Sequence, residues 1–222
     1  MHTFEEWKKK LIIVRGGGDI ATGTIYKLHQ SRFPVLVLEI ANPSCIRRTI
    51  SFCEAVFDKE VEVEGVIAKR ADSLEEAFAI YEQGQIPVMI DENGSTIETL
   101  HPPVVVDAIL AKKNLGTKIT DAPVVIGVGP GFCAEKDVDA VIETQRGVEP
   151  GDILADIEGT PVETVIGGVI RGMIREGYPV KKGLKIADVD PRVKEQENCY
   201  HISDKARCVA GGVLEAILHL SK

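Results

Sequence analysis

A glycine-rich turn follows a short apolar run near the start of the chain. The run spans 11–14, and the turn reads Gly16, Gly17, Gly18, Asp19, Ile20 and Ala21. In a G-x-G-x-x-A pattern, Gly16 allows a sharp turn, Gly18 lets a pyrophosphate approach the backbone, and Ala21 keeps the next helix close to the sheet. The start of that helix offers free N–H groups and a positive dipole end, so the turn predicts a phosphate-binding site.

An acidic residue ends the next apolar run at the spacing that a ribose-binding carboxylate has. Glu39 lies near the end of 35–40, after an amphipathic segment over 20–30. Strand, turn, helix and strand within about 30 residues predict a βαβ unit of the Rossmann type. A tight turn in a Rossmann-like sheet without a ligand is the competing interpretation. Asp19 favours the turn without a ligand, because a carboxylate repels a neighbouring pyrophosphate.

Two further segments carry candidate site residues. Arg47 and Arg48 can hold a phosphate or carboxylate, and a nearby cation would lower the pKa of Cys53 and make it nucleophilic. A solvated arginine pair and a structural cysteine explain the same residues. The glycines Gly129 and Gly131 follow another apolar run, and they either complete a crevice at the strand ends or form a plain loop.

The remaining pattern predicts an α/β fold with a mostly parallel sheet. Strands are expected at 61–67, 86–90 and 123–128, and helices at 73–81, 104–113 and from Ser203 to the end. Thr3 with Glu6 and Ser73 with Glu76 fit capping boxes, the first of them at a short leading helix, and Ser203 fits an N-cap. The last helix has an apolar stripe that includes Val209, Val213 and Leu218, and its Gly211 and Gly212 predict the close approach of another backbone. Glycine becomes frequent after about residue 140, where turn-and-strand repeats predict a small, barrel-sandwich-like β module. We therefore expect a Rossmann-like domain at 1–140, the β module at 141–200, and a closing helix at 201–222 that packs back on the first domain.

The composition and charge of the chain argue against several classes of binding partner. The 222 residues carry a net charge of −8, which argues against nucleic acid or an anionic membrane surface as the main partner. No apolar run reaches the length of a membrane span, and the N-terminus lacks the features of a secretory signal. Five irregularly spaced cysteines and scattered histidines match no disulfide framework or metal site, so a cytoplasmic protein without a metal centre is expected.

Several sequence blocks taken together resemble the YqeB-type selenium-dependent molybdenum hydroxylase accessory proteins. They lie at 15–23, 46–56, 183–192 and 202–216, nearly from end to end. The resemblance implies a maturation factor whose Rossmann portion is similar to the XdhC accessory proteins, which are thought to receive molybdenum cofactor and help load it, sulfurated, into a hydroxylase. Between Arg146 and Val165 the chain is shorter than the family pattern, which puts the role of the β module in doubt.

Three functions remain open from the sequence. The first is an accessory protein that binds molybdenum cofactor or a nucleotide and docks on a molybdenum hydroxylase apoenzyme, with Arg47 and Arg48 on a phosphate and Cys53 handling sulfur or selenium. The second is an NAD(P)-dependent enzyme, for which only His101 lies near an expected strand end as a proton donor. The third is a non-catalytic sensor or scaffold. The sequence is compatible with a homo-oligomer.

Overall fold

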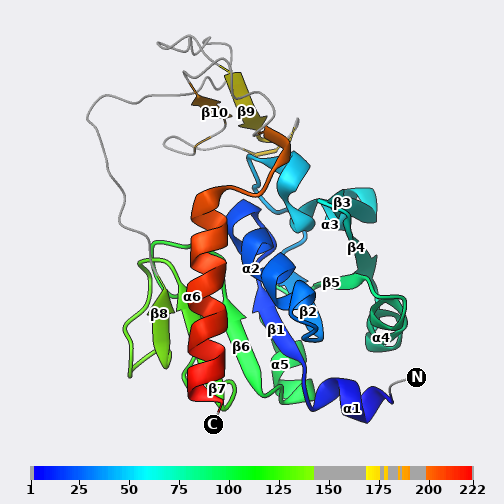
Figure 1. Cartoon of the computed structure of the whole chain (residues 1–222), viewed down its shortest axis with the longest axis vertical. Helices are drawn as coiled ribbons and strands as arrows, with labels where there is room; N and C mark the ends of the chain where they lie inside the picture. The colour runs from blue at the N-terminus through cyan, green and yellow to red at the C-terminus, as the bar shows by residue number, and fades with distance from the viewer. Residues whose placement is uncertain are drawn as a thin grey trace.

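The computed structural model describes residues 3–142, 169–175, 178–179, 185, 187–190 and 199–221. Its centre is an eight-stranded sheet with the order β3-β4-β5-β2-β1-β6-β7-β8 (Figure 1). All neighbouring strands are parallel except β3 and β4, which confirms the Rossmann-like, mostly parallel fold. The strands are β1 (Ile12–Arg15), β2 (Val35–Glu39), β3 (Glu60–Val63), β4 (Val66–Ala71), β5 (Ile86–Ile90), β6 (Val104–Asp107), β7 (Val124–Val128) and β8 (Ala140–Ile142).

Helices cover both faces of the sheet. Because side chains alternate along a strand, Ile12 and Val14 of β1 enter one core and Leu11 and Ile13 enter the other. The first core lies under α2 (Asp19–Gln30) and α6 (Asp204–Leu220). The second lies under α1 (Phe4–Lys8), α4 (Leu74–Glu82) and α5 (Ser95–Leu100). Two 3-10 turns, η1 (Arg48–Ile50) and η2 (Phe52–Glu54), lead into α3 (Ala55–Asp58) and connect β2 to β3.

The closing helix α6 packs along α2, and a glycine permits this close contact. A Cβ atom on Gly23 would lie 2.7 Å from the carbonyl oxygen of Ala206. We expected Gly211 and Gly212 to provide such an approach, and that expectation is wrong. A Cβ on Gly211 would meet nothing within 4 Å, and one on Gly212 would meet only the side chain of Ile142.

Local capping signals are confirmed. Thr3 and Glu6 form a capping box at α1, while Ser73 and Ser203 each accept an N–H in the first turn of α4 and α6. Each cap satisfies a backbone donor that the first turn of a helix leaves unpaired. The buried face of α6 includes Val209 and Val213 as predicted, although Leu218 is 59% exposed.

Two expectations about secondary structure are wrong, and one helix was missed. The segment 104–113 is not a helix: its Val-Val-Val run forms β6, which pairs with β1 and β7 in the centre of the sheet. The expected strand at 61–67 is a hairpin of β3 and β4, which turns at Glu64 and Gly65, both with positive φ. The helix α5 was not predicted.

Few residues of the expected β module are described. They include the antiparallel pair β9 (Val169–Met173) and β10 (Ala187–Asp190), while 143–168 lie outside the described residues. The guanidinium of Arg175 contacts Glu54 and Asp58 and lies 4.3 Å from the ring of Phe57, which connects the end of β9 to α3. Among the described residues, no helix combines the length and the apolar character needed to span a bilayer.

Candidate functional site

A cavity of about 820 Å³ lies at the carboxyl ends of the central strands. The chain places β2, and then β3, β4 and β5, on one side of β1, and it then places β6 on the other side. Ligands of open α/β sheets bind at such a reversal of strand order. The wall includes Arg15 from β1, Glu39 from β2, Glu92 after β5 and Ile109 after β6.

The predicted glycine turn forms part of this cavity wall. Gly16 has a φ of +89°, and its Cβ would lie 3.1 Å from the backbone of Ala108 and Ile109. Gly17 is covered by the backbone of Cys53, whose N–H donates to the Gly17 carbonyl. Gly18 is open, because a Cβ there would meet nothing within 4 Å. The turn therefore leaves free space at Gly18, where α2 begins.

Glu39 holds the turn in place. Its carboxylate accepts the N–H of Gly17 at 2.7 Å and the N–H of Ile40 at 2.8 Å, and the side chain also lines the cavity. Burial raises the pKa of Glu39, and the two backbone hydrogen bonds lower it less. Glu39 thus fixes the glycine turn and also lines the cavity, where the sequence predicts a ribose.

The raised pKa of Glu39 predicts a pH-dependent loss of stability. The folded protein binds this proton more tightly than the unfolded chain, so the free energy of unfolding falls as pH rises from the ordinary glutamate pKa towards the folded value. We expect Glu39→Gln to remove this fall, which is at most about 1.4 kcal/mol per pH unit for one proton. Urea unfolding across acidic to neutral pH measures it, with the exposed Glu98→Gln as the control. Parallel curves for wild type and Glu39→Gln would contradict the assignment.

The starts of two helices open on the cavity. Gly18, Asp19 and Ile20 line it at the start of α2, and Ser203, Asp204 and Lys205 line it at the start of α6. The first hydrogen bond of α2 runs from the N–H of Thr22 to Gly18, and Gly18 provides no side-chain cap. The N–H groups that precede it have no partner within the helix, and they place positive dipole ends towards the cavity.

Arg47 lies where the sequence predicted a phosphate ligand. Its guanidinium is 3.8 Å from the carboxylate of Asp19 and donates to the carbonyl of His201, joining α2 to the start of α6. Arg171 of β9 also lines the cavity and pairs with Asp188 and Asp190. Burial lowers the pKa of Arg47, and Arg171 lowers it further. Asp19 offsets part of this positive charge, which explains how a carboxylate is tolerated beside the turn.

A buried ion pair supports the floor of the cavity. Arg15, at the end of β1, lies 3.4 Å from Asp107, at the end of β6, and both are at most 5% exposed. The hydroxyl of Thr117 contacts both groups, and the second oxygen of Asp107 accepts the N–H of Ile109. This network connects the carboxyl ends of β1 and β6, the two strands between which the strand order reverses.

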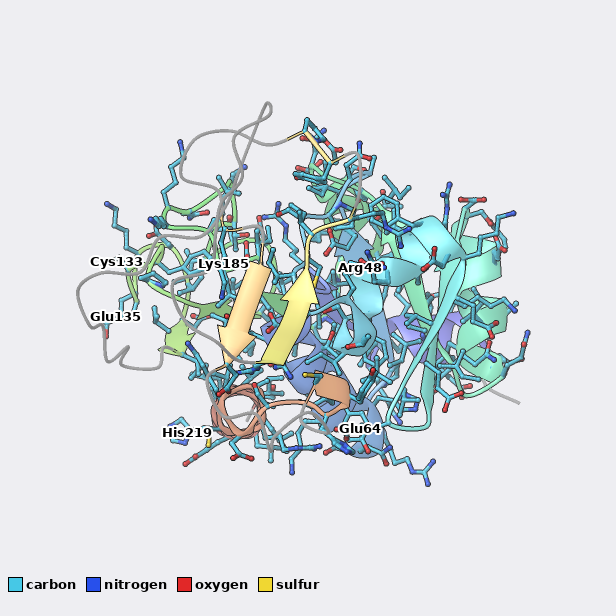
Figure 2. The ribbon with its side chains drawn as sticks, turned by 90° about the horizontal axis from the view of Figure 1, so that it is seen from above. Arg48, Glu64, Cys133, Glu135, Lys185 and His219 are labelled. Atoms are coloured by element: carbon cyan, nitrogen blue, oxygen red, sulfur yellow. The ribbon has the colours of Figure 1, made fainter. Side chains whose placement is uncertain are left out.

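Other predicted site residues lie elsewhere. Arg48, the first residue of η1, pairs with Glu54 and is not among the described lining residues. Figure 2 shows it apart from Lys185, which lies beside β10 and lines the cavity. Gly129 donates to Ile142, and Gly131 packs on the backbone of 111–113, so neither is among the described lining residues. Ala21 is buried in the core beneath α2. The roles of Arg48, Gly129 and Gly131 remain predictions.

Cys53 lies at the cavity together with a second thiol that sequence reasoning missed. Cys45 and Cys53 both line the cavity, and the Cys45 thiol donates to the hydroxyl of Ser51 at 2.7 Å. The Cys45 thiol and burial raise the pKa of Cys53 well above the usual value. Of the two interpretations of the sequence, this direction favours a structural cysteine over a nucleophile activated by a cation. The Cys53 thiol lowers the pKa of Cys45, against the effect of burial and with help from Ser51.

Residues far apart in the sequence account for what was missed. Arg15, Asp107 and Thr117 meet only through the pairing of β1 with β6, and Asp190 and Arg171 meet through β9 and β10.

Within the described ranges, no three histidine, cysteine or acidic side chains gather as metal ligands. His101 precedes β6 and so lies near the amino ends of the strands, away from the cavity edge.

The strand order and the cavity at its reversal define a Rossmann-like α/β protein. Its sequence is 39% identical over 259 residues to a protein from Escherichia coli (strain K12) named "Uncharacterized protein YqeB", a match that covers 95% of this chain. No family model and no solved structure matches the chain.

The chain spans about half the length of this relative, since the match covers 48% of it. The matched stretch is longer than the 222 residues of this chain, so the relative carries insertions. The similarity supports the YqeB-type resemblance over nearly the whole chain. The shortening expected between Arg146 and Val165 lies outside the described residues.

Proposed function

We propose that the protein binds an anionic, phosphate-bearing cofactor in the cavity, with a phosphate at the starts of α2 and α6. The observation that carries this proposal is the convergence of two helix N-termini on one cavity, with open space at Gly18. Free N–H groups and aligned dipoles at a helix start bind phosphate, and the buried guanidinium of Arg47 adds a fixed positive charge.

The class of cofactor that we propose is based on the YqeB-type resemblance and on the residues of the cavity wall. Molybdenum cofactor is a pterin phosphate, often extended to a dinucleotide, and Glu39 faces the space that a ribose would fill. We propose an accessory role in which the chain holds this cofactor, or a nucleotide, for a molybdenum hydroxylase apoenzyme. An NAD(P)-dependent reaction is less well supported, because His101 does not lie on the cavity. A sensor that binds without turnover uses the same geometry.

Gly18→Ala tests the phosphate site. Gly18 has a φ of −64° and free space around it, so alanine should fold normally while its methyl group occupies the phosphate position. We expect the melting temperature without ligand to change little and the ligand-induced rise to disappear. For wild type, that rise corresponds to about 2.7 kcal/mol at a hundredfold excess over the dissociation constant.

The measurement is a thermal-shift screen with NAD(H), NADP(H), FAD, ATP, CTP and molybdopterin compounds. A shift confined to molybdopterin compounds supports the accessory role, and a shift with NAD(P) supports the enzyme. Gly211→Ala is the matched control, since Gly211 also has open space but lies within α6. No shift with any compound, or equal shifts for wild type and Gly18→Ala, would overturn the phosphate site.

A further inference from the structure

The segment 199–203, which leads into α6, is anchored to the chain around η1. The hydroxyl of Thr49 donates to the carbonyl of Cys199 at 2.8 Å, and the guanidinium of Arg47 donates to the carbonyl of His201 at 3.0 Å. His201 and the four residues after it all line the cavity. The position of this lead-in segment therefore sets where α6 starts and where the guanidinium of Arg47 lies.

A carboxylate that is not among the described lining residues also anchors the lead-in segment. Glu64, in the turn between β3 and β4, accepts the N–H of Ile202 at 2.8 Å (Figure 2). One guanidinium nitrogen of Arg207, in the first turn of α6, donates to both oxygens of Glu64 at 2.7 and 2.6 Å. The ring of His201 lies 3.6 Å from the same carboxylate, and the Glu64 side chain is 15% exposed. Glu64 thus holds the backbone on both sides of Ser203, the cap of α6.

Glutamate is an unusual residue for this place in a hairpin. Glu64 and Gly65 form a two-residue turn between the paired residues Val63 and Val66, and their φ angles are +48° and +79°. Positive φ at both positions favours Asn, Asp or Gly at the first of them. A glutamate is strained there, and such strain persists where other contacts hold it. The contacts of the Glu64 carboxylate with the lead-in segment and α6 account for its presence.

We propose that Glu64 is a positioning residue for the phosphate site, because its carboxylate fixes the lead-in segment and thereby the start of α6 and the guanidinium of Arg47. This inference rests on the proposed function, since it concerns the same phosphate. Glu64 fixes the N–H of Ile202, and the neighbouring residues carry the carbonyl that Arg47 contacts and the cap of α6. Loss of the carboxylate releases one anchor of the backbone that orients both phosphate-binding groups.

The charge of Glu64 alone predicts the opposite effect on binding. A carboxylate near an anion site repels the anion, so its removal would strengthen phosphate binding slightly if charge were all that mattered. Loss of positioning weakens binding instead, because the N–H groups of α6 and the guanidinium of Arg47 no longer converge on one phosphate. The sign of the change in affinity therefore separates the two effects.

The experiment measures the dissociation constant of pyrophosphate for the folded full chain by isothermal titration calorimetry. Glu64→Asn and Glu64→Gly suit the positive φ and shorten or remove the anchoring side chain. We expect each to weaken binding by about tenfold, the effect that loss of an outer contact has at metal sites. Glu64→Gln keeps an acceptor for the Ile202 N–H and should bind more tightly than either. Glu62→Gln removes the same charge from an exposed position of β3 and should not weaken binding.

Hydrogen exchange without pyrophosphate gives a second readout. In Glu64→Asn, the amides of 202–206 should exchange faster than in wild type, whereas those of β1 should exchange at the wild-type rate. A general loss of stability would accelerate both. Unchanged exchange at 202–206 would overturn the positioning role.

The outcomes separate this inference from the proposed phosphate site. If wild type binds pyrophosphate and a folded Glu64→Asn or Glu64→Gly binds it equally well or more tightly, the positioning role is overturned and the phosphate site stands. The same holds if Glu62→Gln weakens binding as much as Glu64→Asn does. If wild type does not bind pyrophosphate, both fail. Unfolding of both Glu64→Asn and Glu64→Gly, checked by circular dichroism, would show that Glu64 holds the fold itself and would overturn the positioning role.

Discussion

Asp107→Ala is expected to lower the free energy of unfolding by roughly 3–5 kcal/mol, because it leaves a buried charge without its partner. Asp107 is 1% exposed and pairs with Arg15, which is 5% exposed. The substitution also removes the acceptor for the hydroxyl of Thr117 and the N–H of Ile109. Guanidinium unfolding followed by circular dichroism measures the loss.

A double replacement separates the lost charge balance from the lost side-chain volume. Arg15→Met with Asp107→Leu replaces both charges by apolar groups, which is often nearly neutral for a buried ion pair. We expect the double variant to be more stable than Asp107→Ala alone. If Asp107→Ala lowers the free energy of unfolding by less than about 1 kcal/mol, water in the cavity already solvates the guanidinium of Arg15. That result would refute the structural role of the pair.

Gly23→Ala is expected to destabilise the protein although alanine is the better helix former. Its Cβ would lie 2.7 Å from Ala206 O and 2.8 Å from Ala206 Cβ, and both helices must shift to accept it. Overpacking of this kind costs typically 1–3 kcal/mol. The expected result is a lower unfolding midpoint in urea with an unchanged dependence on denaturant.

Gly211→Ala supplies the matched comparison. It makes the same change within α6, where the added methyl group meets nothing within 4 Å. Helix propensity alone should then raise stability by up to about 1 kcal/mol. Opposite signs for the two variants support the close α2–α6 contact, whereas a stabilising Gly23→Ala would show that the helices are farther apart than described.

Local signals made much of the fold predictable. The caps at Thr3, Ser73 and Ser203 and the glycine turn depend on neighbours within a few residues, and each occurs where the sequence places it. The prediction of a helix at 104–113 was wrong because a short apolar run fits a buried strand as well as a helix. Its pairing with β1 and β7, which decides the question, involves residues distant in the sequence.

The site was predictable only in part, for the same reason. Gly18, Glu39 and Arg47, which the sequence singled out, all line the cavity, and the βα unit itself brings the first two together. It could not predict that Arg48, adjacent to Arg47, turns away to Glu54. Nor could spacing predict that Cys45 lines the cavity with its thiol on the hydroxyl of Ser51, because an irregular loop brings it there.

The packing of α6 on α2 also has a consequence for synthesis on the ribosome. The apolar face of α2 around Gly23 and Ile25 is translated first, and the helix that covers it follows only after the whole sheet has been translated. A nascent chain therefore exposes this face until α6 has left the exit tunnel. We expect chaperones that recognise apolar segments to bind nascent chains halted before α6 and to dissociate once Asp204–Leu220 has emerged.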